Sequence, residues 1–275
     1  MVIGIILLVV VVLERSSQRA SENRPRPTAV LPTPSIPSIS VPSLSGVPGE
    51  HSPSGSQSQQ CATYVIVTVR GTGEQDDGDQ LLSPVANQIM GELDEVAPEA
   101  TYVSLDYPAS FDLRRSAEQG IGALVQLLTE QAQACPGQRF VLLGYSQGAM
   151  VVTDALISPE SRRWGQDVAA LPSEAAQRVD AVVLYGDLGF AGSEPFNAGD
   201  YDPSRSGTMA RPQGSLDAYA SRIRSFCVRD DFFCQSGGGG SLRGHLEYFS
   251  NGMREQGAEF ALEAVAARRS AAASG

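Results

Sequence analysis

Lysine is absent from this chain of 275 residues, and histidine, tryptophan and cysteine are scarce, at two, one and four residues. All 20 basic side chains are therefore arginine, against 31 Asp and Glu, which leaves a formal net charge of −11. A protein that binds nucleic acid needs a basic surface to replace the counterions of the phosphates. The charge balance therefore excludes nucleic acid as an expected partner.

Cofactor and metal signatures are missing as well. No Gly-Xaa-Gly-Xaa-Xaa-Gly follows the first expected strand, so that nothing there predicts a dinucleotide site. The spacing of the four cysteines resembles no tetrahedral zinc site. We therefore expect neither an organic cofactor nor a metal ion.

A hydrophobic run long enough for a full membrane span is not found at the start of the chain. Residues 1–13 are apolar, but thirteen helical residues rise only about 20 Å, against about 30 Å for the hydrocarbon core of a bilayer. We expect residues 1–18 to be a signal peptide or a signal anchor and the rest to be exported. No clear Ala-Xaa-Ala cleavage site follows, which favours an anchor at a membrane.

The next segment has few large apolar residues. Residues 19–60 are rich in Pro, Ser, Thr and Gly, and such a segment buries too little apolar surface to offset its ordering entropy. We expect a disordered linker there, a folded domain at 61–270 and a short disordered tail at 271–275. A domain of that length is long enough for one sizeable core.

All four cysteines belong to the expected domain, at Cys61, Cys135, Cys227 and Cys234. An even number in an exported chain predicts two disulfides formed in an oxidising compartment. Four cysteines allow three pairings. The short step from Cys227 to Cys234 favours a local bridge, which would leave Cys61 for Cys135.

Strands and helical periods alternate along the domain, which predicts a parallel sheet covered on both faces. The expected strands are residues 64–69, 101–105, 140–143, 179–187 and 222–228, and the expected helices are 83–93, 114–134, 149–156 and 244–268.

The segment 140–156 organises this domain. An apolar run ends in Gly-Tyr-Ser-Gln-Gly at 144–148 and continues as a helix-like stretch. A strand that turns sharply into a helix through two glycines holds its central serine, Ser146, in a strained conformation with the hydroxyl exposed. The pattern predicts a nucleophile elbow, and its alternative is an ordinary turn between a strand and a helix.

A serine needs a base, and the chain offers few. His51 lies in the expected linker, so His245 is the eligible histidine. Asp230 and Asp231 precede it in the loop between Cys227 and Cys234. The order Ser, Asp, His is that of the α/β-hydrolases, unlike the orders of other serine hydrolases. The sequence therefore predicts acyl transfer.

Together these motifs resemble the cutinase family over about residues 61–268. The matching positions are a cysteine before the first strand, Arg70-Gly71-Thr72 after it, Gly-Tyr-Ser-Gln-Gly at 144–148, Tyr185-Gly186-Asp187, Cys-Xaa3-Asp-Xaa2-Cys at 227–234 and His-Leu-Xaa-Tyr at 245–248. The resemblance implies a secreted serine esterase on a compact α/β-hydrolase fold. That fold is a three-layer sandwich with a central, mostly parallel, five-stranded sheet.

Site roles follow from the resemblance by position. It implies that Ser146 is the nucleophile, His245 the general base and Asp231 the acid that orients the imidazole, with Asp230 as the alternative acid. The backbone N–H of Gln147 and the loop residue Thr72 would form the oxyanion hole. The disulfide pairs implied are Cys61–Cys135 and Cys227–Cys234.

Substrate breadth stays open on the sequence. Gly237–Gly240 precede His245, where the resemblance implies an apolar flap for long acyl chains. We expect a monomer that hydrolyses short- to medium-chain esters. Alternatives are a lipase or phospholipase acting on envelope or host lipids, favoured by the apolar N-terminus, and a non-catalytic envelope module. The last predicts a broken triad, whereas all three members are present.

Overall fold

A computed structural model describes residues 61–75, 82–94 and 100–274 of the chain. The expected signal segment (1–18) and linker (19–60) lie outside the described residues, so both stay predictions. The described part belongs to one compact unit, residues 60–275. Within it, no helix is both long and apolar enough to cross a membrane.

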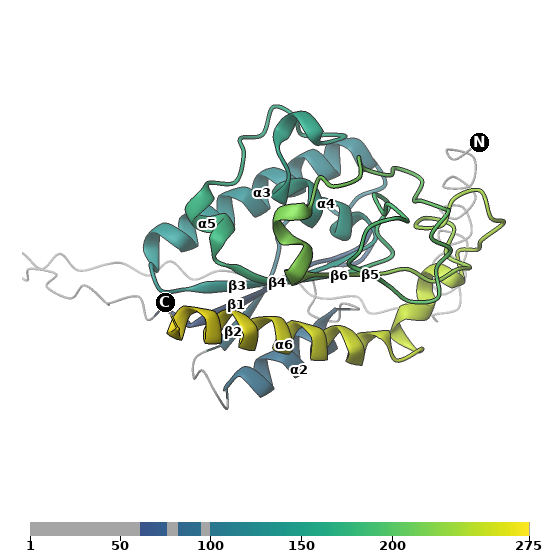
Figure 1. Cartoon of the computed structure of the whole chain (residues 1–275). Helices are drawn as coiled ribbons and strands as arrows, with labels where there is room; N and C mark the ends of the chain where they lie inside the picture. The colour runs from purple at the N-terminus through teal and green to yellow at the C-terminus, as the bar shows by residue number, and fades with distance from the viewer. Residues whose placement is uncertain (1–60, 76–81, 95–99, 275) are drawn as a thin grey trace, which may run out of the picture. The chain divides into compact units, whose positions relative to one another are not determined.

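A parallel sheet forms the middle layer (Figure 1). Its strands are β1 (Tyr64–Val69), β2 (Ala100–Ser104), β3 (Arg139–Tyr145), β4 (Val179–Tyr185), β5 (Asn197–Ala198) and β6 (Ile223–Phe226), in the spatial order β2-β1-β3-β4-β6-β5. Every paired neighbour runs parallel. β1 and β4 are buried along their whole length, as expected for strands covered on both faces.

Helices cover the two faces of this sheet. The long helices are α2 (Ser83–Asp94), α3 (Leu113–Ala134), α4 (Gln147–Leu156) and α6 (Met253–Ala273), with a short α5 (Ser173–Gln177). Figure 1 shows α3, α4 and α5 on one face and α2 and α6 on the other. Alternate residues of β1 divide between two cores: Val65 and Val67 pack with α3 and α4, and Tyr64 and Ile66 with α2 and α6.

The predicted three-layer α/β architecture is confirmed, with small corrections. The sheet has six strands rather than five, because the two-residue β5 pairs with the edge of β6. The expected helix 244–268 is divided into a 3₁₀ turn η3 (Gly244–Phe249) and α6, separated at Gly252, whose φ is 85°. Helix α6 continues to Ala273, so most of the expected tail 271–275 is helical.

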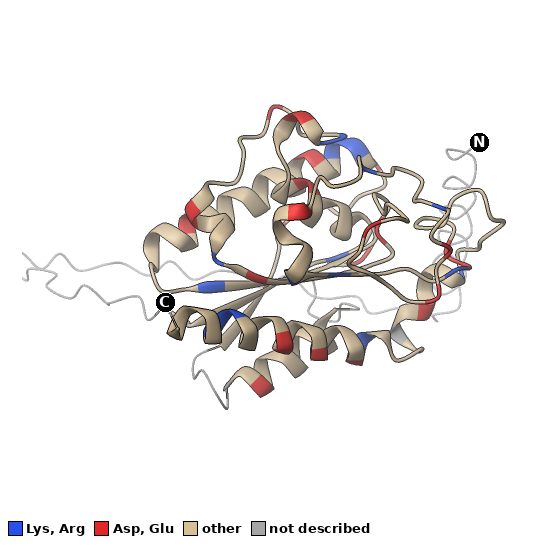
Figure 2. Ribbon diagram, viewed as in Figure 1, with Lys and Arg blue, Asp and Glu red and all other residues tan. Residues whose placement is uncertain are grey.

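Shorter 3₁₀ turns, η1 (Pro159–Ser161) and η2 (Asp217–Arg222), complete the described elements. Two disulfides join Cys61 to Cys135 and Cys227 to Cys234, the pairing that the resemblance implies. Arginines and acidic residues are interspersed along the ribbon rather than gathered into one basic face (Figure 2).

Candidate active site

Ser146 lies between the end of β3 and the start of α4, at the carboxyl edge of the sheet. Its φ of 57° is unusual for a residue with a side chain. Two glycines make this turn sterically feasible. A Cβ on Gly148 would lie 1.9 Å from the carbonyl oxygen of Val69, and one on Gly144 would lie 2.7 Å from Ala149 Cα. The strand-to-helix turn is therefore the elbow that the sequence predicts.

His245 comes from η3, far from Ser146 in sequence, and its imidazole reaches the serine. Its Nε2 lies 2.8 Å from Ser146 Oγ. Tyr145 holds the histidine from two sides: its hydroxyl donates to the His245 carbonyl at 2.8 Å, and its ring stacks on the imidazole with centroids 5.1 Å apart. Gly186 leaves room for the ring, since a Cβ there would lie 2.7 Å from His245 Cε1.

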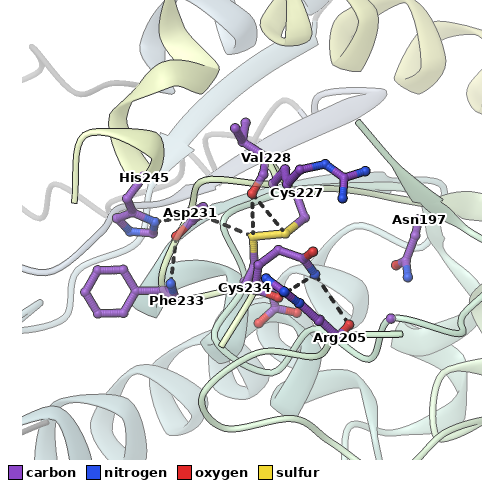
Figure 3. The surroundings of a disulfide bond; sticks show 12 residues. Asn197, Arg205, Cys227, Val228, Asp231, Phe233, Cys234 and His245 are labelled. Atoms are coloured by element: carbon purple, nitrogen blue, oxygen red, sulfur yellow. Dashed lines mark hydrogen bonds and ion pairs between the residues drawn. A yellow bond between two sulfur atoms is a disulfide. The ribbon is translucent and has the colours of Figure 1, made fainter. Parts of the chain in front are cut away.

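Asp231 completes a hydrogen-bonded line that runs from the serine through His245. Figure 3 shows the contacts of Asp231 with His245 and Phe233. Its Oδ2 lies 2.9 Å from His245 Nδ1, and its Oδ1 accepts the N–H of Phe233 at 2.8 Å. A carboxylate beside Nδ1 selects the tautomer with the proton on that nitrogen, so Nε2 is free to accept the serine proton. Asp231 is fully buried, and Ser146 and His245 are nearly so.

Asp230, the alternative acid, lies elsewhere. Its side chain is exposed, and its carboxylate accepts a hydrogen bond from the Ser241 hydroxyl at 2.6 Å. The neighbouring carboxylates thus have different environments, and the one in contact with the imidazole is Asp231. The structure therefore brings together Ser146, His245 and Asp231 and leaves Asp230 out of this line.

Gln147 begins α4, so its backbone N–H has no partner within the helix and is available beside Ser146. The side chain of Gln147 is buried and held at both ends. Its Nε2 donates to the Ser110 carbonyl at 3.1 Å, and its Oε1 accepts the Ser116 hydroxyl at 2.9 Å. These contacts tie the start of α4 to α3 and to the loop before it.

The loop that carries Thr72 is also well anchored. Arg70 donates to the carbonyl oxygens of Leu105 and Tyr107, and the N–H of Gly73 donates to the Ala109 carbonyl at 2.7 Å. Thr72 itself is half-buried in this turn. Its part in an oxyanion hole stays a prediction, as does that of Gln147.

Known proteins match this chain over the same domain. A family model described as Cutinase matches residues 60–265. The chain belongs to the cutinase family. It is 35% identical over 208 residues to a protein named Cutinase from Kineococcus radiotolerans, a match that covers 75% of this chain and only 63% of that protein. Carboxylesterase Culp1 from Mycobacterium tuberculosis is 30% identical over 217 residues, which covers 76% of this chain and 86% of that protein.

A solved structure agrees on the fold of this cutinase-family chain. The catalytic core domain of acetyl xylan esterase from Trichoderma reesei has a TM-score of 0.60 at 23% identity, covering 74% of this chain and 98% of that chain. At this level of identity the similarity concerns the fold. The three-layer α/β-hydrolase architecture is therefore shared.

Two contacts of this cutinase-family site were not predicted from the sequence. One is the side chain of Gln147 with its partners Ser110 and Ser116. The other is Tyr248, whose hydroxyl donates to Asp231 Oδ2. A signal for the second existed, because Tyr248 follows His245 by three residues and side chains at that spacing lie on one face of a 3₁₀ turn.

A cavity of about 180 Å³ lies beside α4, and its lining includes Asp154, Arg162 and Arg211. None of Ser146, Asp231 and His245 lines it. Burial raises the pKa of Asp154 to about 7, with the nearby Arg211 opposing the change. Among the described residues, no group of His, Cys, Asp and Glu is arranged to hold a metal ion.

Proposed function

We propose that this chain is a serine carboxylic ester hydrolase that acts through Ser146, His245 and Asp231. One observation carries the proposal: Ser146 Oγ, the two imidazole nitrogens and Asp231 Oδ2 form a continuous line with steps of 2.8 and 2.9 Å. Hydrogen-bond reach between nucleophile, base and orienting acid is the geometric requirement for an activated serine. The names of its relatives, cutinase, carboxylesterase and acetylxylan esterase, support the ester class.

In the first half of the proposed reaction, Ser146 Oγ attacks the carbonyl carbon of the ester. His245 Nε2 takes the hydroxyl proton, and Asp231 stabilises the resulting imidazolium. The negative charge on the carbonyl oxygen would be met by the backbone N–H of Gln147 and by Thr72. When the tetrahedral intermediate collapses, the imidazolium returns its proton to the leaving alcohol, and the acyl group stays on Ser146.

In the second half, His245 takes a proton from a water molecule, whose oxygen attacks the acyl carbon. The second tetrahedral intermediate collapses, the carboxylic acid leaves, and Ser146 recovers its proton from the imidazolium. No metal or organic cofactor enters this sequence of steps. The proton transfers between Ser146 Oγ and His245 Nε2 join atoms that lie 2.8 Å apart.

The test is hydrolysis of p-nitrophenyl esters with acyl chains from two to sixteen carbons, by the purified chain under oxidising conditions. We expect activity that falls by about four orders of magnitude or more in Ser146→Ala and His245→Ala. Asp230→Asn is the matched control, since its carboxylate does not contact the imidazole. Full activity in the Ser146→Ala variant would refute the proposal.

A second substrate class has an observation in its favour. Leu242 and Leu246, on either side of His245 in sequence, are 44% and 53% exposed, so each presents apolar surface to solvent. These residues favour an ester presented by a lipid surface. Activity on micellar phospholipid that exceeds activity on a soluble short-chain ester would select this class, and the reverse would select short- to medium-chain esters.

The compartment belongs to the same proposal. Two disulfides support folding outside the reducing cytoplasm, and an exported esterase would meet its substrate at the cell surface or beyond. Residues 1–13 would serve either as a cleaved signal or as a membrane tether. The mass of the mature chain recovered from the producing cell distinguishes the two. We propose a monomer without a nucleic-acid partner.

A further inference from the structure

Tyr248 is fully buried beside the proposed catalytic acid. Its hydroxyl donates a hydrogen bond to Asp231 Oδ2 and accepts one from the backbone N–H of Val228 at 3.2 Å. The second contact orients the hydroxyl, because the N–H of Val228 occupies a lone pair and leaves the proton directed at the carboxylate. The surroundings of this acid loop, including the Cys227–Cys234 disulfide, are drawn in Figure 3.

The same carboxylate oxygen serves both Tyr248 and His245. Oδ2 accepts the imidazole Nδ1–H at 2.9 Å as well as the tyrosine hydroxyl, while Oδ1 accepts the N–H of Phe233. His245 and Tyr248 both come from η3, three residues apart, so one helical turn holds Asp231 with two side chains. Three donors therefore fix the orientation of a fully buried carboxylate.

Resting on the proposed function, we propose that Tyr248 is a positioning residue: its hydroxyl holds Asp231 against His245 and withdraws part of the carboxylate charge from the imidazole. A hydrogen bond from a neutral donor stabilises the ionised carboxylate and thereby weakens its pull on the Nδ1 proton. Tyr248 thus sets both the geometry and the basicity of the general base. Nothing in this role requires contact with substrate.

The Tyr248 hydroxyl keeps its proton, and so stays a hydrogen-bond donor, at neutral pH. Burial and the neighbouring Asp231 carboxylate raise the pKa of Tyr248. Tyr145, whose ring stacks on the imidazole, has its pKa raised by burial and by the carboxylates of Asp231 and Glu74. The titratable groups in contact with the imidazole are Asp231, Tyr145 and Tyr248, and the raised pKa values keep both tyrosine hydroxyls protonated.

Tyr248→Phe tests the role, because it removes the hydroxyl and keeps the ring. We expect kcat to fall about tenfold with KM unchanged, since a hydrogen bond to a charged group is lost. We also expect the midpoint of the acidic limb of the kcat/KM profile to move to higher pH. Without its second donor, Asp231 binds the imidazolium more strongly, and a higher pH is needed to obtain the neutral base.

Tyr185→Phe is the matched control. Tyr185 is equally buried and its ring packs edge-on against that of Tyr248 at 6.0 Å, but its hydroxyl donates to the Arg254 carbonyl. If the role of Tyr248 were only structural, both variants would change kcat equally. The midpoint of the acidic limb of the kcat/KM profile would then stay at the same pH in both. An unmoved limb and unchanged kcat in Tyr248→Phe would overturn the proposal.

An activity-free readout separates this proposal from the proposed function. The full chain has two histidines, His51 and His245, so imidazole ¹⁵N labelling reports on two rings, each with an Nδ1 and an Nε2 signal. We expect the His245 midpoint to rise in Tyr248→Phe and not in Tyr185→Phe, whether or not any ester is hydrolysed. If Tyr248→Phe does not fold, ¹³C labelling of tyrosine in the unmutated chain replaces it: a Tyr248 Cζ signal that ignores the His245 titration overturns the proposal.

Discussion

Asp154 is a buried carboxyl within α4 that the proposed reaction does not use. It is 3% exposed, and its Oδ2 has no hydrogen-bond partner within the described structure. Burial raises the pKa of this group to about 7. In the unfolded chain this carboxyl has the ordinary aspartate pKa of about 4. At pH 5 or 6 the unfolded chain has therefore released a proton that the folded state still holds.

This difference predicts how stability depends on pH. The free energy of unfolding should fall as pH rises from about 4 to about 7, because ionisation costs more in the folded state, and should then level off. Asp154→Asn removes the titration, so its stability relative to the unmutated chain should increase by about 2 kcal/mol between pH 5 and pH 8. Denaturant unfolding at both pH values measures this, with the exposed Asp167→Asn as control. Parallel pH profiles would contradict it.

At the scale of elements, the close contact between β1 and α4 depends on Gly148. Its Cα approaches the end of β1 so closely that any added side chain meets the main chain of Val69 and Arg70. Backbone atoms cannot rotate away as a flexible side chain would, so the strand or the helix would have to move. The elbow that presents Ser146 therefore depends on this packing as well as on its own strained backbone.

Gly148→Ala should destabilise the fold by about 3 kcal/mol or more and should lower ester hydrolysis with it. The matched variant is Gly91→Ala in α2, where a Cβ meets nothing within 4 Å. Alanine is the better helix former, so this change should stabilise by up to about 1 kcal/mol. Thermal unfolding of both variants checks the pair. A Gly148→Ala protein as stable and as active as the original would refute the close approach.

At the scale of the whole molecule, the two disulfides act on different properties. The Cys61–Cys135 bridge closes a separation of 74 residues, between the chain before β1 and the end of α3. The Cys227–Cys234 bridge closes seven residues that include Asp231. In the chain-entropy description a long closed loop stabilises more than a short one. We therefore expect stability to depend mostly on the first bridge and catalysis mostly on the second.

Replacing both members of each pair by serine tests this separation. Cys61→Ser with Cys135→Ser should lower the free energy of unfolding by about 4 kcal/mol and leave kcat unchanged at temperatures where the variant is folded. Cys227→Ser with Cys234→Ser should cost about 2 kcal/mol and lower kcat, because the loop that holds Asp231 loses its closure. Equal effects of the two replacements on kcat would contradict the assignment.

Much of this architecture could be predicted from local patterns. The elbow residues, the eligible histidine and the cysteine spacing are visible along the chain, since each depends on residue type and near neighbours. Strand β5 and the break at Gly252 were missed, because a two-residue strand has no periodic pattern of its own and exists through its pairing with β6. The helical end of α6 was missed for a similar reason, since its alanine-rich sequence has little amphipathic pattern.

The sequence by itself determined which residues could carry the chemistry: one serine in an elbow, one histidine outside the linker and two adjacent aspartates. The family resemblance favoured Asp231 as the acid, and only the tertiary structure shows that Asp231, not Asp230, contacts the imidazole. The fold buries Asp231 against His245 and leaves Asp230 exposed to pair with Ser241. Contacts such as these, and that of Tyr248 with Asp231, join side chains through the closure of a loop onto a helical turn. The periodicity of residues along the chain does not predict such a closure, because the closure depends on how distant elements pack.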